Sequence, residues 1–114
     1  MQLLFKLILS ITMLVAVANA QTIKVGTNAT YPPFEFVNEQ NQITGFDMDL
    51  MAEIAKKVGF KIEIVNISFD SLIPALKAGK IDIIAAAMSA TPERIKAVDF
   101  SKSYYKTKKK KKKK

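Results

Sequence analysis

The sequence contains no cysteine and no histidine among its 114 residues. Without cysteine, the chain can form neither a disulfide framework nor a lipid-modified N-terminal cysteine. The absence of both residue types also excludes the common zinc sites, cysteine nucleophiles and Ser-His-Asp triads. No glycine-rich phosphate-binding loop occurs along the chain. We therefore predict no metal, no cofactor and no catalytic residue.

The net charge of +8 is concentrated outside the part of the chain that is expected to fold. Lysines fill positions 108–114, whereas residues 21–107 hold ten basic and ten acidic side chains. Because like charges repel one another, residues 106–114 are predicted to form a disordered poly-lysine tail. Such a tail could bind nucleic acid or anionic lipid non-specifically, but no basic cluster interleaved with aromatic residues accompanies it, so we predict no nucleic-acid partner. As a hypothesis, we favour an origin of the lysine run in adenines read in the wrong frame.

The first 20 residues have the organisation of a secretory signal peptide. Lys6 precedes an apolar run at residues 7–18, and residues 18–20 read Ala-Asn-Ala, which is an A-x-A cleavage site. A membrane anchor is the alternative, but the apolar run is shorter than the roughly 20 residues that span a bilayer. We therefore predict cleavage before Gln21 and a periplasmic location.

Five strands are predicted after the leader. Residues 22–26 and 61–65 alternate apolar and polar side chains, as half-buried strands do. Residues 35–37 and 42–44 flank a polar turn and predict a small hairpin. Ile81 to Ala87 is too apolar for a half-exposed strand and predicts a central strand buried on both faces.

Three helices are predicted between and after these strands. The first begins with Asp47 as N-cap and ends at Gly59. The second begins at Ser68 or Asp70 and ends at Gly79. The third begins with Thr91 as N-cap and Pro92 at the first helical position. In the first helix Met48, Met51, Ala55 and Val58 form an apolar stripe. The resulting β-α-β-α-β-α order predicts an α/β fold with a mostly parallel sheet and helices on both faces.

Ligands of such sheets bind beyond the carboxyl ends of the strands, which selects the loops at residues 27–34, 67–70 and 88–94. Arg94 lies in the first turn of the last predicted helix, where a cation is electrostatically unfavourable unless an anion accompanies it. A carboxylate could accept both the backbone donors and a bidentate guanidinium fork there. The simpler alternative is that Arg94 is a solvated surface charge.

Three aromatic residues, Tyr31, Phe34 and Phe69, fall in these loops. They are either lids over the core or a stacking wall for a small organic ligand. The residues alone leave both interpretations open.

Asp47 and Asp49 are the candidates for a carboxylate pair with a catalytic or metal-binding role. Side chains two residues apart at a helix start point in different directions. Helix capping and compensation of the helix dipole explain the two aspartates more simply, and we favour that explanation.

The sequence resembles the bacterial extracellular solute-binding proteins for polar amino acids, which are the soluble receptors of ABC importers. The resemblance runs from Ile23 to Tyr105. It rests on ordered motifs: Gly26–Phe36, which looks like the first ligand loop; Gly45–Leu50, which reads G-F-D-x-D-L; Leu72–Leu76 and Gly79–Asp82, which match the second helix and third strand; Thr91–Arg94, which reads T-x-E-R; and Val98–Ser101 with Tyr104-Tyr105.

The resemblance implies a type II periplasmic-binding-protein fold that closes on its ligand as two hinged lobes, with residues 21–105 as a truncated first lobe. It also implies roles for particular residues. Arg94 would clamp the ligand α-carboxylate, and Ser89 would donate its N–H and hydroxyl to the same group. Ala87 would offer its carbonyl to the ligand α-ammonium group.

The resemblance also implies which residues contact the ligand side chain. Tyr31 and Phe69 would sandwich it. Asn28 stands where relatives that bind cationic or some amide side chains have aspartate. Because an amide supplies no negative charge, this difference argues against lysine, arginine or ornithine and favours a neutral polar amino acid.

The function implied by the resemblance is that of the substrate-binding component of an ABC transporter. It would capture a polar amino acid in the periplasm and deliver it to an inner-membrane permease, without enzymatic chemistry. The alternatives are a periplasmic enzyme on the same fold, of cyclohexadienyl-dehydratase or lytic-transglycosylase type, and the ligand-binding domain of a sensor kinase. A further alternative is a polycationic surface binder that acts through its lysine tail.

The sequence ends near the expected hinge, just after Tyr105. We therefore expect the second-lobe contacts to be missing. Half of a clamshell cannot bury a ligand, which predicts weak or absent amino-acid binding by residues 21–107.

Overall fold

The computed structural model describes residues 20–106. Nearly all of the predicted signal peptide and nearly all of the predicted poly-lysine tail lie outside the described residues. The proposed domain boundaries therefore remain predictions. No helix within residues 20–106 is both long and apolar enough to cross a membrane.

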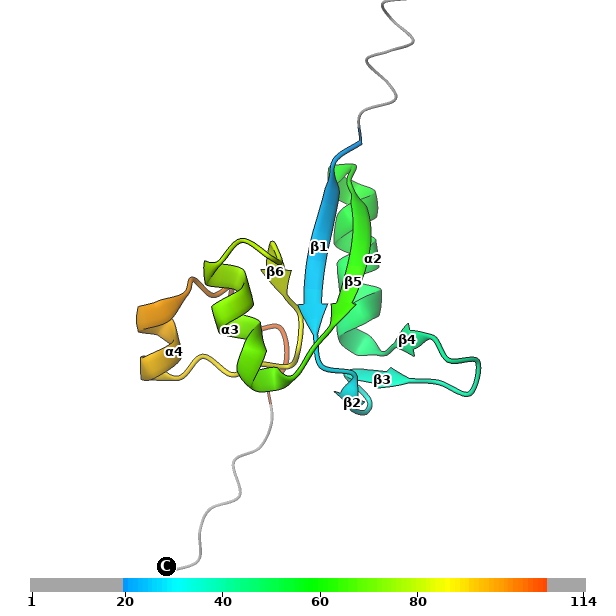
Figure 1. The fold of residues 1–114 in the computed structure, drawn as a ribbon. Coiled ribbons are helices and arrows are strands. Elements are labelled where there is room, and N and C mark those ends of the chain that lie inside the picture. Colours follow the sequence, from blue (N-terminus) through cyan, green and yellow to red (C-terminus); the bar gives the residue numbers. More distant parts are fainter. Residues whose placement is uncertain (1–19, 107–114) are drawn as a thin grey trace, which may run out of the picture.

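Three parallel strands form the main sheet, in the order β5-β1-β6. They are β1 (Thr22–Thr27), β5 (Lys61–Asn66) and β6 (Ile83–Ile84). Strand β1 pairs with β5 along its whole length and with β6 near its carboxyl end (Figure 1). The predicted parallel sheet and its first two strands are confirmed.

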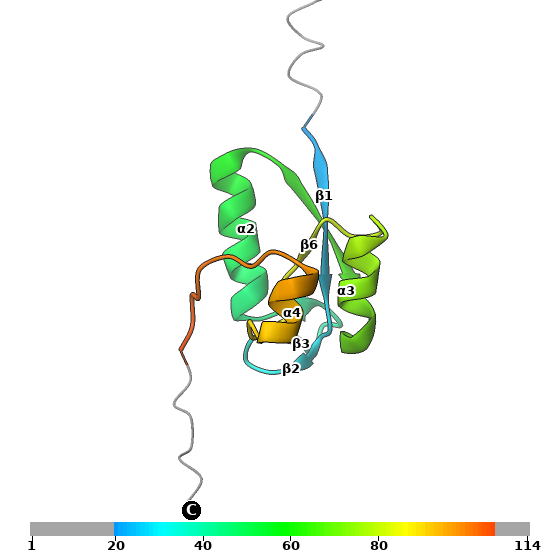
Figure 2. The same cartoon turned by 90° about the vertical axis from the view of Figure 1, so that its left-hand side faces the viewer.

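Helices cover both faces of this sheet, as the alternating order of elements predicts. Helix α2 (Phe46–Val58) and helix α3 (Phe69–Lys77) lie on opposite sides of β1 (Figure 2). Beneath α2, Val25 packs with Met48, Met51 and Ala85. The second core cluster, beneath α3, joins Leu72, Ile81 and Ala86.

The close approach of α3 to the sheet depends on Gly26. A Cβ atom at this position would lie 2.4 Å from Cδ1 of Ile81 and 3.2 Å from Cδ2 of Leu72. Any side chain at Gly26 would therefore displace the second core cluster. The neighbouring residue, Val25, is fully buried and fills the space beneath α2 instead.

A small antiparallel sheet branches from the carboxyl end of β1, in the order β2-β3-β4. Its strands are β2 (Thr30–Tyr31), β3 (Glu35–Val37) and β4 (Ile43–Thr44), so the predicted hairpin is confirmed. In the hairpin turn, Oδ1 of Asn38 accepts hydrogen bonds from the backbone N–H groups of Gln40 and Gln42.

The last helix, α4 (Pro92–Ala97), begins as the sequence predicts. The Thr91 hydroxyl accepts a hydrogen bond from the Arg94 backbone N–H at 3.2 Å, and Pro92 occupies the first turn. The end of α2 is also as predicted, since Gly59 adopts the left-handed conformation with φ of 91°.

The prediction of a central strand from Ile81 to Ala87 is wrong. Strand β6 covers two residues, Ile83 and Ile84, which are half-buried, and among the described residues it pairs with β1 alone. Two local features limit it. The Asp82 carboxylate accepts the backbone N–H of Lys24, and Ala87 turns the chain with a positive φ of 48°.

Two predictions for α2 are also wrong. Gly45, not Asp47, is the N-cap, and the Asp47 side chain makes no capping hydrogen bond. Instead it is buried and points to partners elsewhere in the chain. Val58 does not complete the apolar stripe, because it lies in the last turn of the helix and is 71% exposed.

We expect Leu72→Ala to lower the free energy of unfolding by about 2–5 kcal/mol, because it leaves a cavity in a fully buried cluster. Val58→Ala is the matched control: it also shortens an apolar helical side chain, but at an exposed position. Urea unfolding followed by far-UV circular dichroism measures both. Equal effects of the two substitutions would contradict the assigned core.

Candidate functional site

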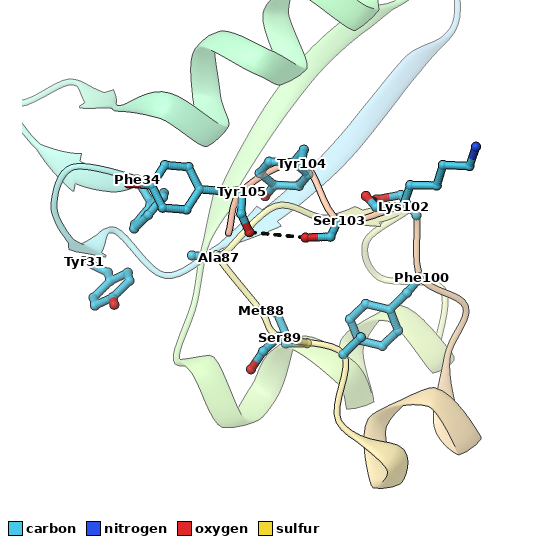
Figure 3. A pocket seen from close by; sticks show the side chains of 12 residues that line it. Tyr31, Phe34, Ala87, Met88, Ser89, Phe100, Lys102, Ser103, Tyr104 and Tyr105 are labelled. Carbon is cyan, nitrogen blue, oxygen red and sulfur yellow. Dashed lines mark hydrogen bonds between the residues drawn. The ribbon is translucent and has the colours of Figure 1, made fainter. Parts of the chain in front are cut away.

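A pocket of about 390 Å³ lies at the carboxyl ends of β1 and β6. Its wall combines Tyr31 and Phe34 from the loop after β1, residues 87–90 from the loop after β6, and residues 100–105 (Figure 3). The connection that follows β1 runs to β5 on one edge, and the connection that follows β5 crosses to β6 on the other edge. The carboxyl ends of β1 and β6 therefore meet at the switch point where open α/β sheets place ligands. Two of the three predicted ligand loops therefore meet in one pocket.

Aromatic rings form one side of the pocket. The rings of Tyr31 and Phe34 are stacked with centroids 5.5 Å apart, and Tyr105 meets Phe34 edge-on at 4.8 Å. Phe34 is buried, whereas Tyr31 and Tyr105 are 55% and 52% exposed. Phe34 packs beneath two rings whose exposed surfaces line the pocket. The stacking of Tyr31 on a ligand stays a prediction.

Arg94 is held in place by the loop that precedes its helix. Its Nη1 donates to the Ser89 carbonyl oxygen at 3.0 Å and to Ser89 Oγ at 3.2 Å. The guanidinium carbon also lies 5.2 Å from the centroid of the Phe69 ring, within cation–π range. Arg94 is half-buried and its guanidinium group is held by contacts within the chain. The binding of an anion by Arg94 stays a prediction.

Phe69 and Asn28 both make contacts within the chain that sequence reasoning did not predict. Phe69 packs beneath Arg94 and is not part of the pocket wall that contains Tyr31. The Asn28 amide has an internal partner at each end: Nδ2 donates to the Ile67 carbonyl at 2.9 Å, and Oδ1 accepts from the Thr30 hydroxyl at 2.6 Å. Asn28 therefore ties the first ligand loop to the end of β5.

Ala87 occupies the turn that carries the chain from β6 into the pocket. Its φ of 48° is unusual for a residue other than glycine. Its backbone N–H donates to Oδ2 of Asp47 at 2.7 Å, and the Tyr104 hydroxyl donates to Oδ1 at the same distance. Sequence reasoning missed this contact, because the partners are 40 and 57 residues from Asp47.

A second acidic residue lies beside Asp47. Glu35 is 1% exposed, and burial raises its pKa to about 8, with further contributions from a hydrogen bond to Asp47 and from the charge of Asp47. The same carboxyl groups, together with burial, raise the pKa of the Tyr104 hydroxyl. Within residues 20–106, no group of three or more acidic side chains is placed to hold a metal ion.

The fold and the pocket agree with the family comparison. A model of the bacterial extracellular solute-binding proteins, family 3, matches residues 23–112. The chain belongs to this family.

Curated relatives carry the same segment within longer proteins. A probable histidine-binding protein of Campylobacter jejuni is 59% identical over 87 residues, which make up 76% of this chain and 34% of that protein. The arginine-binding extracellular protein ArtP of Bacillus subtilis is 48% identical over 81 residues, or 71% of this chain and 31% of the relative. The chain therefore spans about a third of the length of these relatives.

Solved structures confirm the fold as the first lobe of a type II periplasmic binding protein. The arginine-bound form of domain 1 from TmArgBP is 49% identical with a TM-score of 0.72, covering 74% of this chain and 67% of that one. A periplasmic binding protein of Salmonella typhimurium, described as highly specific for arginine, is 45% identical with a TM-score of 0.74, covering 75% and 38%.

We expect the protein to lose stability as the pH rises from about 4.5 to about 8. In this window folded Glu35 keeps a proton that the unfolded chain releases, so the free energy of unfolding falls by up to about 1.4 kcal/mol per pH unit. Glu35→Gln should remove this component, because glutamine does not ionise. Urea unfolding at several pH values measures it, with Glu39→Gln as an exposed control. A fall in Glu35→Gln as steep as in the unchanged protein would refute the assignment.

Proposed function

We propose that this chain is the ligand-binding part of an amino-acid receptor of an ABC importer. The observation that carries the proposal is that Ser89, which lines the aromatic pocket at the switch point of the sheet, accepts two hydrogen bonds from Arg94 beside that pocket. The names of the relatives, which are histidine- and arginine-binding proteins, support an amino acid as the ligand class.

The proposed carboxylate site consists of Arg94 and Ser89. A guanidinium group has five N–H donors, and the two contacts to Ser89 use Nη1. These contacts orient the guanidinium plane, so that its other donors can form a bidentate pair with a ligand α-carboxylate. Phe69 supports the same plane from one side. In this proposal, Ala87 offers its carbonyl to the ligand α-ammonium group.

We propose a ligand side chain that is planar and nitrogen-rich, as in arginine or histidine. The exposed rings of Tyr31 and Tyr105 suit stacking and cation–π contact with such a group. Asn28 argues less strongly against a cation than its sequence position suggests, because both ends of its amide already have internal partners. Glutamine is the alternative, since one similar solved structure is an ancestral arginine-binding protein bound to glutamine.

The proposal includes binding by this lobe alone. The arginine-bound domain 1 of TmArgBP shows that, in that protein, one domain holds an amino acid. We therefore expect measurable binding here as well, against the sequence-based expectation of weak or absent binding. Enclosure by a second lobe would strengthen it, because enclosure removes more of the ligand surface from water.

The proposed role is binding and delivery without chemistry. The relatives named above are binding proteins, and the residues of the pocket serve recognition in this proposal. The predicted leader and the family membership support a periplasmic location, and delivery would require an inner-membrane permease as partner. A catalytic role on the same fold would show as consumption of the bound amino acid, which proton NMR of the mixture measures.

Isothermal titration calorimetry of the purified protein with arginine, histidine and glutamine tests the proposal. We expect arginine or histidine to bind more tightly than glutamine. Arg94→Gln should weaken binding by about tenfold or more, because it removes a charge-assisted contact to the carboxylate. Lys96→Gln, which removes one charge from the exposed side of the same helix, should leave affinity unchanged. Absence of heat with all three ligands in a folded sample, or equal effects of both substitutions, would overturn the proposal.

A further inference from the structure

The Asp47 carboxylate connects two parts of the pocket wall that are far apart in the sequence. One oxygen accepts the Ala87 N–H and the other accepts the Tyr104 hydroxyl, both at 2.7 Å. Ala87 and Tyr104 both line the pocket (Figure 3). Because Asp47 is fully buried, water does not compete for either hydrogen bond. A shift of this carboxylate would therefore move both sides of the pocket.

The backbone conformation of Ala87 indicates why its hydrogen bond to Asp47 matters. A non-glycine residue with φ near +48° is held in a sparsely populated region and needs support from its surroundings. The short hydrogen bond from its N–H to Asp47 supplies that support. The next residues, Met88 and Ser89, continue into the pocket wall and the Arg94 contact.

Glu35 explains how a buried carboxylate can remain in this position. Within the described residues, Oε2 of Glu35 is buried and has no hydrogen-bond partner. Two ionised carboxylates side by side in a site without water repel each other, so each disfavours the charge of the other. A proton on Glu35 removes this repulsion and supplies a donor for Asp47.

We infer that Asp47 is a positioning residue for the amino-acid site, and that Glu35 acts as its protonated partner and makes the position of the ligand loop sensitive to pH. The consequence for ligand binding rests on the proposed function. The positioning of Ala87 does not. The inference depends on the geometry of the buried carboxyl pair and its two donors.

The titratable groups around Glu35 define the direction of the effect. Asp47 faces it from α2 and Tyr104 from the carboxyl-terminal segment, while Tyr31 pairs with it across β2 and β3. Among residues 20–106, no basic side chain opposes the effect of burial and Asp47, which raise the pKa of Glu35 to about 8. Above this pH, ionised Glu35 repels Asp47 and loosens its hold on Ala87 and Tyr104.

The test follows the backbone amide signal of Ala87 by ¹⁵N NMR as the pH crosses about 8. In the full chain we expect this signal to titrate with a midpoint near that value. Glu35→Gln should abolish the titration, because glutamine donates to Asp47 at every pH. Glu39→Gln, on the exposed hairpin turn, should titrate like the unchanged protein. A pH-independent Ala87 signal, or an unaltered titration in Glu35→Gln, would overturn the inference.

Tyr104→Phe provides a second variant that does not alter the acidic pair. It removes one donor from Asp47, and we expect the Ala87 amide signal to shift because the freed carboxylate changes its contact with Ala87. A purely structural contribution of the Tyr104 ring would leave that signal in place, since phenylalanine keeps the ring. An unchanged Ala87 signal would therefore refute the coupling through Asp47.

Affinity for arginine, measured by calorimetry in the same pH series, tests the consequence for binding. We expect the dissociation constant to rise by about fivefold or more above the midpoint in the unchanged protein and to stay constant in Glu35→Gln. If arginine, histidine and glutamine all fail to bind at every pH, the proposed function fails. The Ala87 titration still decides the positioning role. Binding that is equally pH-dependent in Glu35→Gln would contradict the role of the pair.

Discussion

Strand β1 has parallel partners on both of its edges, β5 on one side and β6 on the other. This double pairing constrains the rest of the molecule. Parallel strands end at the same edge of a sheet, so the loops that leave β1 and β6 must approach each other there. The two faces of β1 are equally constrained, because Val25 fills the cluster beneath α2 while Gly26 leaves room for Leu72 and Ile81. One six-residue strand thus positions both core clusters and the mouth of the pocket.

The elements that sequence reasoning predicted correctly are those with local signals. Alternating side chains located β1 and β5, and Gly59 and Thr91 marked helix ends through their backbone conformation and capping chemistry. The length of β6 has no local signal of this kind. Although β1 has six residues, it pairs with β6 over only two of them, between the Asp82 carboxylate that accepts the Lys24 N–H and the turn at Ala87. In residues 81–87 the hydrophobic side chains indicate burial, but they do not predict how far the strand pairs.

The candidate site divides in the same way. Tyr31, Ala87 and Ser89 come together in the pocket, and Arg94 joins them through Ser89. Their roles toward a ligand remain proposals. Phe69 is not part of the pocket wall, and its ring packs against the Arg94 guanidinium group.

Asp47 shows where local rules fail. An aspartate at the start of a helix predicts an N-cap, and that rule considers only its nearest neighbours. Its actual partners, Ala87 and Tyr104, are brought to it by the tertiary fold. Tyr105 belongs to the Tyr104-Tyr105 motif of the sequence. Its contact with Phe34 has no local signal, because the contact depends on where the last described segment lies.

The arrangement of charge along the loop after β6 fits the proposed ligand class. At one end of this loop, the Ala87 N–H donates to Asp47 of the buried acidic pair, which carries one negative charge while Glu35 holds its proton. At the other end, the loop holds the cationic fork of Arg94 through Ser89. An α-amino acid is a zwitterion whose ammonium and carboxylate groups are joined through one carbon atom. A loop with a negative region at one end and a fixed cation at the other can orient such a ligand before its side chain is read. Under the proposed function, the aromatic rings would select among amino acids, whereas the Ala87–Arg94 loop would recognise the ammonium and carboxylate groups that all amino acids share.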